Sequence, residues 1–323
     1  MKLLIPGGAG YIGSHMVKYA QDRGHEVIVL DDFSTGHDWA VNDCEILQVD
    51  LLDQEKLARS LRGRKFDGVI HFAAKSIVSE SVKKPDLYYR NNVVGTLNLV
   101  NELLKNEINN LVFSSTAAVF GNHSGGKIGE DTPRIPINPY GQSKLMIENI
   151  LCDICSSYEF NATCFRYFNA AGADISGAIG ESHNPETHLI PNILKSALSQ
   201  EHTLKVFGND YPTTDGTCVR DYVHVSDLAQ AHFLGLTKMR ENKGYSVYNL
   251  GNGSGFSVLD VIKGCQRVIG APINFDVEGR RAGDPAVLVA DSKEAIDVLG
   301  WNPKFDDLDT IMSSAWRWHQ KHG

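Results

Sequence analysis

The chain has 323 residues, of which 42% are hydrophobic and 22% are charged, and its formal net charge is −8. These values are typical of a globular protein with one large domain or two smaller ones, each with its own core. The acidic balance argues against a nucleic-acid or anionic-membrane partner. The apolar run at residues 3–5 is too short for a secretory signal, and no stretch reaches the roughly 18 apolar residues of a membrane helix.

The first half of the chain alternates short apolar runs with segments of helical periodicity. The predicted strands are residues 2–5, 26–30, 45–49, 68–72, 110–114 and 163–167, and the predicted helices are residues 14–23, 54–61, 85–105 and 140–157. Strands separated by helices indicate right-handed βαβ units and a parallel sheet covered on both faces. We therefore predict an α/β fold with a Rossmann-type, doubly wound parallel sheet over residues 1–169.

After Asn169 the regular alternation ends, and residues 170–187 are rich in Gly, Ala and Asp without a clear period. Further on, we predict helices at residues 189–199, from Ser226, from a capping Ser257 to residue 268, and at residues 292–299 and 307–321. Strands are predicted at residues 204–207 and 247–250. We expect a smaller C-terminal α/β substrate region over residues 170–323, with residues 220–250 returning to the first domain.

The six cysteines are scattered over the chain, at positions 44, 152, 155, 164, 218 and 265. Only Cys152 and Cys155 have the spacing of metal ligands, and they lie in a segment with helical periodicity without a second CxxC. We therefore expect buried structural cysteines, no metal site, and a reduced, cytoplasmic protein.

The first predicted strand runs into a glycine-rich turn in which Gly7, Gly10 and Gly13 form a GxxGxxG pattern. Such glycines permit a tight turn and a close approach of the backbone to a pyrophosphate, which the positive N-terminus of the next helix then binds. A glycine triplet alone is a weak signal, but this one lies between a strand and a helix at the start of a βαβ unit. It predicts a dinucleotide-binding site.

Residues at the ends of the following strands indicate which dinucleotide is bound. Asp31 and Asp32 close the second strand, where a carboxylate accepts hydrogen bonds from ribose hydroxyls and repels a 2′-phosphate, so we predict NAD rather than NADP. The predicted cofactor residues from these turns are Gly7, Gly10, Tyr11, Ile12, Gly13, Asp31, Asp32, Ser34, Thr35, Gly36, Asp50, Leu51, Phe72, Ala73 and Ala74.

Tyr140 and Lys144 form a YxxxK pattern after the fifth predicted strand. Residues four apart share one face of a helix, so the ammonium would lie beside the phenol and lower its pKa from about 10. Tyr140 would then serve as a general acid and base. The spacing is common by chance, but it gains weight behind a dinucleotide fingerprint. Thr116 follows the fifth strand and adds a hydroxyl at the same sheet edge.

Together these motifs resemble the UDP-glucose (UDP-galactose) 4-epimerases of the extended short-chain dehydrogenase/reductase superfamily. The resemblance runs from Lys2 to about Trp318, and it rests on residues 7–13, 71–74, 80–82, 91–93, 138–144, 166–169, 207–213, 219–225, 248–251 and 280–284.

The resemblance implies reversible 4-epimerisation of a UDP-hexose. Tyr140 would take the proton of the 4-hydroxyl while bound NAD accepts the hydride, the 4-keto sugar would rotate, and the hydride would return to the other face. Lys144 would bind the nicotinamide ribose, Thr116 would hold the 4-oxygen, and Asn92 and Phe168 would line NAD. The residues implied for the UDP-sugar are Thr116, Asn169, His188, Leu189, Lys205, Val206, Phe207, Arg220, Arg281 and Asp284.

The resemblance also implies a homodimer, through helices 85–105 and 140–157. The chain departs from common family residues at Pro6, Ser76, Phe120 and His188. Leu288 matches a position that gates the sugar 2-substituent, where its intermediate size leaves a UDP-N-acetylhexosamine 4-epimerase as an alternative.

Two other functions compete with epimerisation. A nucleotide-sugar 4,6-dehydratase or decarboxylase would carry an acidic residue just after the active-site threonine, whereas Thr116 is followed by Ala117 and Ala118. A non-catalytic NAD-binding sensor would be favoured by the loss of Tyr140 or Lys144, and both are present.

Overall fold

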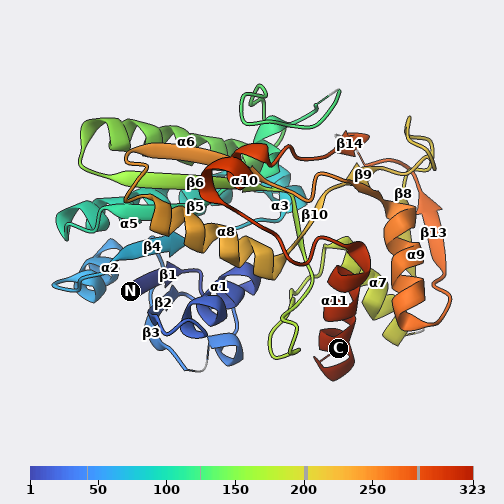
Figure 1. The fold of residues 1–323 in the computed structure, drawn as a ribbon, viewed down its shortest axis with the longest axis horizontal. Helices are drawn as coiled ribbons and strands as arrows, with labels where there is room; N and C mark the ends of the chain where they lie inside the picture. The colour runs from blue at the N-terminus through green and yellow to red at the C-terminus, as the bar shows by residue number, and fades with distance from the viewer. Residues whose placement is uncertain (42, 124, 200–202, 282–283, 323) are drawn as a thin grey trace.

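The computed structural model describes residues 1–41, 43–123, 125–199, 203–281 and 284–322 (Figure 1). None of the helices in these ranges combines the length and apolar character that crossing a bilayer requires.

The core of the first region is a seven-stranded sheet in the order β11-β6-β5-β4-β1-β2-β3, with parallel pairing throughout. Its strands are β1 Lys2–Pro6, β2 Glu26–Asp31, β3 Glu45–Gln48, β4 Gly68–His71, β5 Asn110–Ser114, β6 Asn161–Tyr167 and β11 Tyr245–Leu250. The inner strands are buried on both faces, as a parallel sheet requires. The predicted Rossmann-type α/β class is confirmed.

Helices cover both faces of this sheet (Figure 1). On one face, α1 Tyr11–Gln21, α8 Val225–Lys238 and α10 Lys293–Leu299 bury apolar residues such as Met16, Leu228 and Leu299. On the other, α2 Gln54–Leu61, α5 Gly95–Lys105 and α6 Pro139–Ser157 bury Leu57, Leu99 and others. Short helical turns at η1 Asp38–Val41 and η3 Ala117–Phe120 follow β2 and β5.

The helix predicted over residues 85–105 is not a single α-helix. It consists of α4 Pro85–Tyr88, a π-helical turn, η2 Tyr89–Val94, and α5, and it is preceded by a helix that was not predicted, α3 Val78–Lys83. The π turn contains the fully buried Asn92, whose side-chain amide donates to the Lys75 carbonyl (3.0 Å) and to Ser143 Oγ (3.1 Å). Periodicity alone does not reveal such a turn.

The C-terminal region packs α7 Leu189–Leu198, α9 Val258–Ile269 and α11 Leu308–His322 around a separate core, in the right-hand part of Figure 1. The capping box of α9 joins Ser257 to Asp260, and the predicted start at Ser257 is confirmed. Three small sheets complete the region: β8 Leu204–Phe207 with β13 Phe275–Glu278; β7 Asn169–Ala171 with β10 Tyr222–His224; and β12 Phe256–Ser257, β9 Val219–Arg220 and β14 Val287–Leu288.

The cysteines depart from the expectation. All six are free: Cys164, Cys218 and Cys265 are buried, Cys44 and Cys155 are half-buried, and Cys152 of α6 is exposed. The prediction of a buried Cys152 was wrong, because the helical periodicity of this segment turns that position to solvent.

Candidate active site

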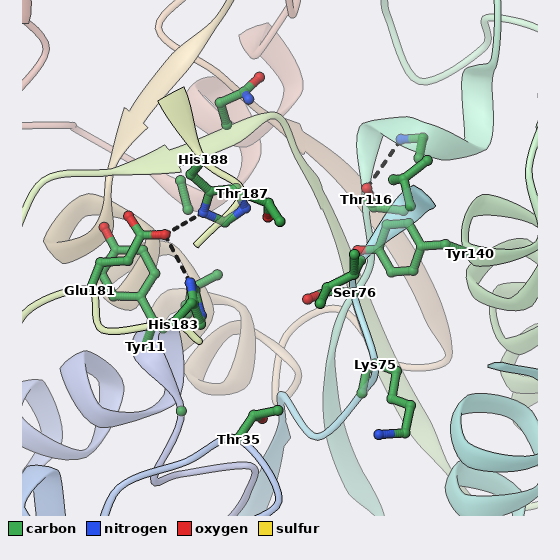
Figure 2. A pocket seen from close by; sticks show the side chains of 18 of the residues that line it. Tyr11, Thr35, Lys75, Ser76, Thr116, Tyr140, Glu181, His183, Thr187 and His188 are labelled. Carbon is green, nitrogen blue, oxygen red and sulfur yellow. Dashed lines mark hydrogen bonds and ion pairs between the residues drawn. The ribbon is translucent and has the colours of Figure 1, made fainter. Parts of the chain in front are cut away.

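A cavity of about 1260 Å³ lies between the carboxyl ends of the parallel strands and the C-terminal region (Figure 2). This is the usual position of ligands in an open α/β sheet. Every predicted cofactor and substrate residue lines the cavity except Asn92, which the structure places behind the wall. Asn92 instead braces the loop at Lys75 against α6 through its hydrogen bonds.

The turn after β1 is built for the close approach of a large anionic ligand. Gly7 has φ +78°, and a Cβ at this position would lie 2.3 Å from the Ala73 nitrogen. A Cβ on Gly13 would lie 2.0 Å from the Gly7 oxygen. Helix α1 begins after Gly10, which gives no side-chain cap, so its first amides remain available to an anion. These features fit the pyrophosphate of a dinucleotide.

Asp31 ties this turn to the end of β2. Its carboxylate accepts hydrogen bonds from the backbone nitrogens of Ala9 (2.9 Å) and Phe33 (2.9 Å), and it lines the cavity. Burial raises the pKa of Asp31, and the two backbone donors offset part of that effect. The remaining acceptor capacity of the carboxylate suits the ribose hydroxyls of NAD and opposes a 2′-phosphate.

Tyr140 enters the cavity from the first turn of α6. That turn is set by Pro139 and by Asn138, whose side chain accepts a hydrogen bond from the Gly141 nitrogen (2.8 Å). Thr116 lies on the same wall (Figure 2), and its Oγ1 accepts from the Ala118 nitrogen (3.1 Å). Burial raises the pKa of Tyr140, while a hydrogen bond with Thr116 lowers it.

Lys144 lies one helical turn further along α6. Its ammonium donates to the Ser114 carbonyl (2.8 Å), and Nζ lies 4.7 Å from the centre of the Phe113 ring. Burial lowers the pKa of Lys144 to about 7. The expectation that Lys144 brings the pKa of Tyr140 below its ordinary value was wrong for the protein alone, because burial disfavours the charged form of both groups.

A buried ion pair holds α6 in place, and it was not predicted. Glu148, four residues after Lys144, pairs with Arg166 of β6 (2.6 Å) and accepts from Ser115 Oγ (2.5 Å). Both charged side chains are almost fully buried. The signal was available, since positions 140, 144 and 148 share one helix face. Glu148 therefore fixes the face that carries Tyr140 and Lys144.

The far end of the cavity carries the predicted substrate residues. Arg220 pairs with Asp284 (2.7 Å), and the Arg281 guanidinium lies 3.9 Å from the centre of the Phe207 ring. Leu288 is paired with Arg220 across the β9–β14 ladder and lines the cavity. The set also includes Asn169, His188, Leu189, Lys205 and Val206, all in the lining. Residues 282 and 283 of the 280–284 motif lie outside the described residues.

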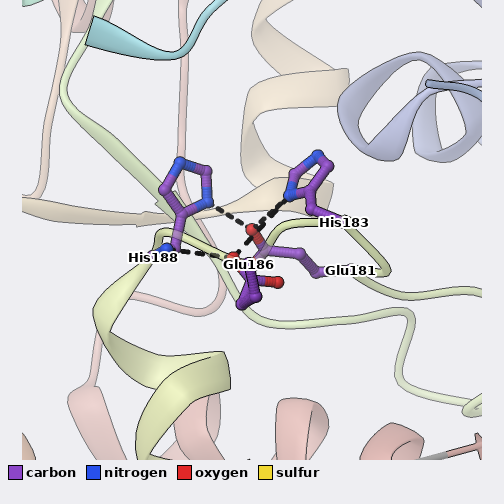
Figure 3. Close-up of side chains that lie close together, drawn as sticks. All are labelled: Glu181, His183, Glu186 and His188. Carbon is purple, nitrogen blue, oxygen red and sulfur yellow. Dashed lines mark hydrogen bonds and ion pairs between the residues drawn. The ribbon is translucent and has the colours of Figure 1, made fainter. Parts of the chain in front are cut away.

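The lining residues that the sequence analysis did not name include Glu181, His183 and Glu186, which gather around the predicted His188 (Figures 2 and 3). Glu181 and the other groups lie across the cavity from Thr116 and Tyr140. Burial alone would lower the pKa of His188, but the Glu181 carboxylate raises this pKa to about 9. Residues 181–188 show no helical or strand periodicity, so the sequence signal for this group is the alternation of Glu and His.

Comparisons with known proteins agree with this site. The model of the NAD dependent epimerase/dehydratase family matches residues 3–251. The UDP-glucose 4-epimerase of Halalkalibacterium halodurans is 48% identical over 322 residues, covering 100% of this chain and 96% of the relative. The crystal structure of UDP-glucose 4-epimerase from Brucella ovis in complex with NAD is 43% identical, with a TM-score of 0.94 and coverage of 98% and 97%.

The crystal structure of UDP-glucose 4-epimerase from Bifidobacterium longum in complex with NAD⁺ and UDP is 36% identical, has a TM-score of 0.93, and covers 99% of this chain and 98% of its own. Identities of this size over whole chains establish the relationship. The chain belongs to the NAD dependent epimerase/dehydratase family.

Proposed function

We propose that the chain interconverts UDP-galactose and UDP-glucose by reversible epimerisation at carbon 4 with bound NAD. One observation carries the proposal: Tyr140, Thr116 and Lys144 meet in the same cavity as a glycine turn suited to a dinucleotide and two arginines suited to a diphosphate. The 48% identity to a UDP-glucose 4-epimerase over the whole chain supports this substrate.

In this proposal Tyr140 moves the proton of the 4-hydroxyl. NAD, when bound, supplies a hydride acceptor that later returns the hydride. Tyr140 removes the proton from the oxygen as the sugar is oxidised and gives it back after the keto sugar has turned its other face. Because burial raises the pKa of Tyr140, its phenolate needs stabilisation, which the Thr116 hydrogen bond and the Lys144 ammonium would supply.

The far end of the cavity would hold the UDP group while the sugar turns. Guanidinium groups match phosphate oxygens in a bidentate manner, which suits Arg220 and Arg281 to the diphosphate. The Asp284 carboxylate holds Arg220 in one orientation. Tight binding of the nucleotide, and weak contacts with the hexose, would allow rotation without release of the intermediate.

The residues after Thr116 weigh against elimination chemistry. Ala117 and Ala118 line the cavity and offer no carboxylate there. Leu288 also lines the cavity, and its intermediate size leaves UDP-N-acetylhexosamine 4-epimerisation as the alternative activity.

The test is product analysis by NMR after the purified protein, with NAD bound and none added, is incubated with UDP-galactose and, separately, with UDP-N-acetylglucosamine. We expect conversion of UDP-galactose to UDP-glucose. A stable 4-keto-6-deoxy product would instead identify a dehydratase, and complete inactivity on both sugars would support a non-catalytic NAD binder. Ready loss of NAD during purification would contradict retention of the cofactor through the cycle.

We also propose a homodimer formed through α5 and α6. Val94 at the end of η2, Leu97 of α5 and Met146 of α6 are exposed apolar side chains, and η2 contacts both helices. Light scattering after size-exclusion chromatography should give twice the chain mass, and Leu97→Glu with Met146→Glu should give the monomer. A monomeric wild type would overturn this part of the proposal.

A further inference from the structure

The loop between β7 and α7 brings together four side chains that can bind a metal: Glu181, His183, Glu186 and His188. One ligand atom of each lies within 4.8 Å of those of the other three (Figure 3). The four residues occupy one segment of eight residues in an alternating Glu and His pattern. We refer to them as the Glu/His cluster.

Glu181 is the centre of the Glu/His cluster. Its Oε1 faces Nδ1 of His183 (3.1 Å) and also Nδ1 of His188, so two imidazoles converge on one carboxylate oxygen. The side chain of Glu181 is 4% exposed. Two imidazole nitrogens and a carboxylate at this spacing are the donor set that Zn²⁺ takes in proteins.

Glu186 adds a second carboxylate to the Glu/His cluster, and one of its oxygens is buried without a partner in the described part of the chain. Its Oε1 accepts from the backbone nitrogens of Thr187 (2.8 Å) and His188 (2.9 Å), and it lies 3.9 Å from His183 Nδ1. Its Oε2 is buried and has no hydrogen-bond partner among the described residues, and the side chain is 4% exposed. A buried carboxylate oxygen without a partner is costly, and a bound cation would remove that cost.

The backbone of the cluster is held from two sides. Trp318 Nε1 donates to the Glu181 carbonyl (3.1 Å), and the His37 ring bonds the Ser182 carbonyl (2.8 Å). The Tyr11 ring of α1 meets the His183 ring edge-on, with ring centres 6.1 Å apart. The loop is therefore anchored to both α11 and α1, and its donor atoms are positioned before any ion binds.

We propose that the Glu/His cluster binds one Zn²⁺, or a divalent transition ion of similar preference, through His183, His188 and the two glutamates. The role of the ion is structural, because it holds the segment that carries His188 against the end of the cavity beside Tyr11. The site is separate from the acid–base chemistry at Tyr140, across the cavity (Figure 2). It does not depend on which sugar the protein accepts.

The test uses tag-free protein with NAD bound, freed of metal with a chelator and dialysed. Zn²⁺ is titrated in competition with a chromophoric chelator, and Co²⁺ is added separately as a spectroscopic probe. We expect one Zn²⁺ per chain and visible d–d absorption from bound Co²⁺. The variants are His183→Ala and the isosteric Glu186→Gln, and His123→Ala is the control, since that histidine lies outside the cluster.

We expect His183→Ala to weaken Zn²⁺ binding by more than about 100-fold and to abolish the Co²⁺ bands, since loss of a ligand exceeds the effect of a supporting residue. His123→Ala should bind as the wild type does. Glu186→Gln should bind Zn²⁺ more weakly with unchanged NAD content and circular dichroism, which separates loss of a ligand from loss of fold. Wild-type protein without stoichiometric Zn²⁺, or equal affinity in the wild type and both cluster variants, would overturn the proposal.

Discussion

The two ends of the cavity are built in different ways. At the cofactor end, the residues meet because each ends or follows a strand of one parallel sheet, so a single rule of topology brings them to one edge. They are Gly7, Asp31, Asp50, Ala73 and Thr116. At the substrate end, residues meet through strands of two to four residues that join distant segments, as β9 and β14 join Arg220 to Leu288. A site on a regular sheet is therefore encoded locally, whereas a site on short strands depends on the whole fold.

Removal of the Tyr140 hydroxyl should have the largest effect, because the cofactor end performs the chemistry in this proposal. Tyr140→Phe should lower turnover by about 10²- to 10⁴-fold, the range of general acid–base catalysis. NAD content and UDP affinity should stay near the wild-type values, because the ring remains. Steady-state kinetics with UDP-galactose gives the rate. Tyr245→Phe is the matched control, because Tyr245 lies on β11 and does not line the cavity; near-normal turnover in Tyr140→Phe would remove Tyr140 from the reaction.

The glycine turn offers the next test of the cofactor end. Gly7→Ala and Gly63→Ala both place a side chain at positive φ, which costs roughly 1–2 kcal/mol. Gly63 has nothing within 4 Å of a new Cβ, whereas the Cβ at Gly7 would meet the Ala73 backbone at 2.3 Å. We expect Gly7→Ala to lower the free energy of unfolding by clearly more than Gly63→Ala and to reduce bound NAD. Denaturant titration and NAD content measure both. Equal losses in the two variants would show that the close approach at Gly7 has no role.

At the substrate end, Arg220→Gln should raise KM for UDP-galactose by roughly 10- to 100-fold, since hydrogen bonds to charged groups contribute about 1.5–3 kcal/mol. NAD content should not change, because the substitution lies outside the glycine turn. Arg59→Gln, at an exposed ion pair on α2, is the control. An unchanged KM in Arg220→Gln would show that the end of the cavity at β9 and β14 does not bind the nucleotide sugar.

Burial of Lys144 predicts a smaller, pH-dependent effect. In NAD-free protein the folded-state pKa is about 7, against about 10.4 in an unfolded chain. Between these values the unfolded state binds more protons, so the cost of burying Lys144 is full below pH 7 and disappears as pH rises toward 10. The stability advantage of Lys144→Met over wild type should therefore shrink by roughly 1.4 kcal/mol per pH unit across this window. Chemical denaturation at several pH values measures it, and a constant or growing advantage would contradict the assignment.

Much of the fold follows from local patterns. Strand β5 and helix α2 have the predicted bounds, and the capping Ser257 starts α9 as expected. The π turn around Asn92 was not predicted, because its cause is a set of hydrogen bonds to Lys75 and Ser143 from other segments. Strands of two residues, such as β9 and β14, are too short to show any alternation.

Most of the candidate site could also be predicted. The residues that follow strands of the parallel sheet and those named from the family resemblance lie in the cavity lining, with the exception of Asn92. Glu148 and Arg166 were missed, since a buried ion pair needs a partner on another element. The raised pKa of Tyr140 depends on burial, which spacing alone does not give.

Oxidation and return of one hydride at carbon 4 is the central claim, and an isotope experiment tests it directly. UDP-galactose labelled with deuterium at carbon 4 is mixed with UDP-glucose whose hexose carries ¹³C and no deuterium, and the products of the NAD-loaded protein are analysed by NMR and mass spectrometry. We expect the deuterium to stay at carbon 4 of the ¹²C sugar that carried it, in both epimers. Loss of the deuterium to water would contradict hydride transfer, and its appearance in ¹³C-labelled sugars would contradict return within one cavity.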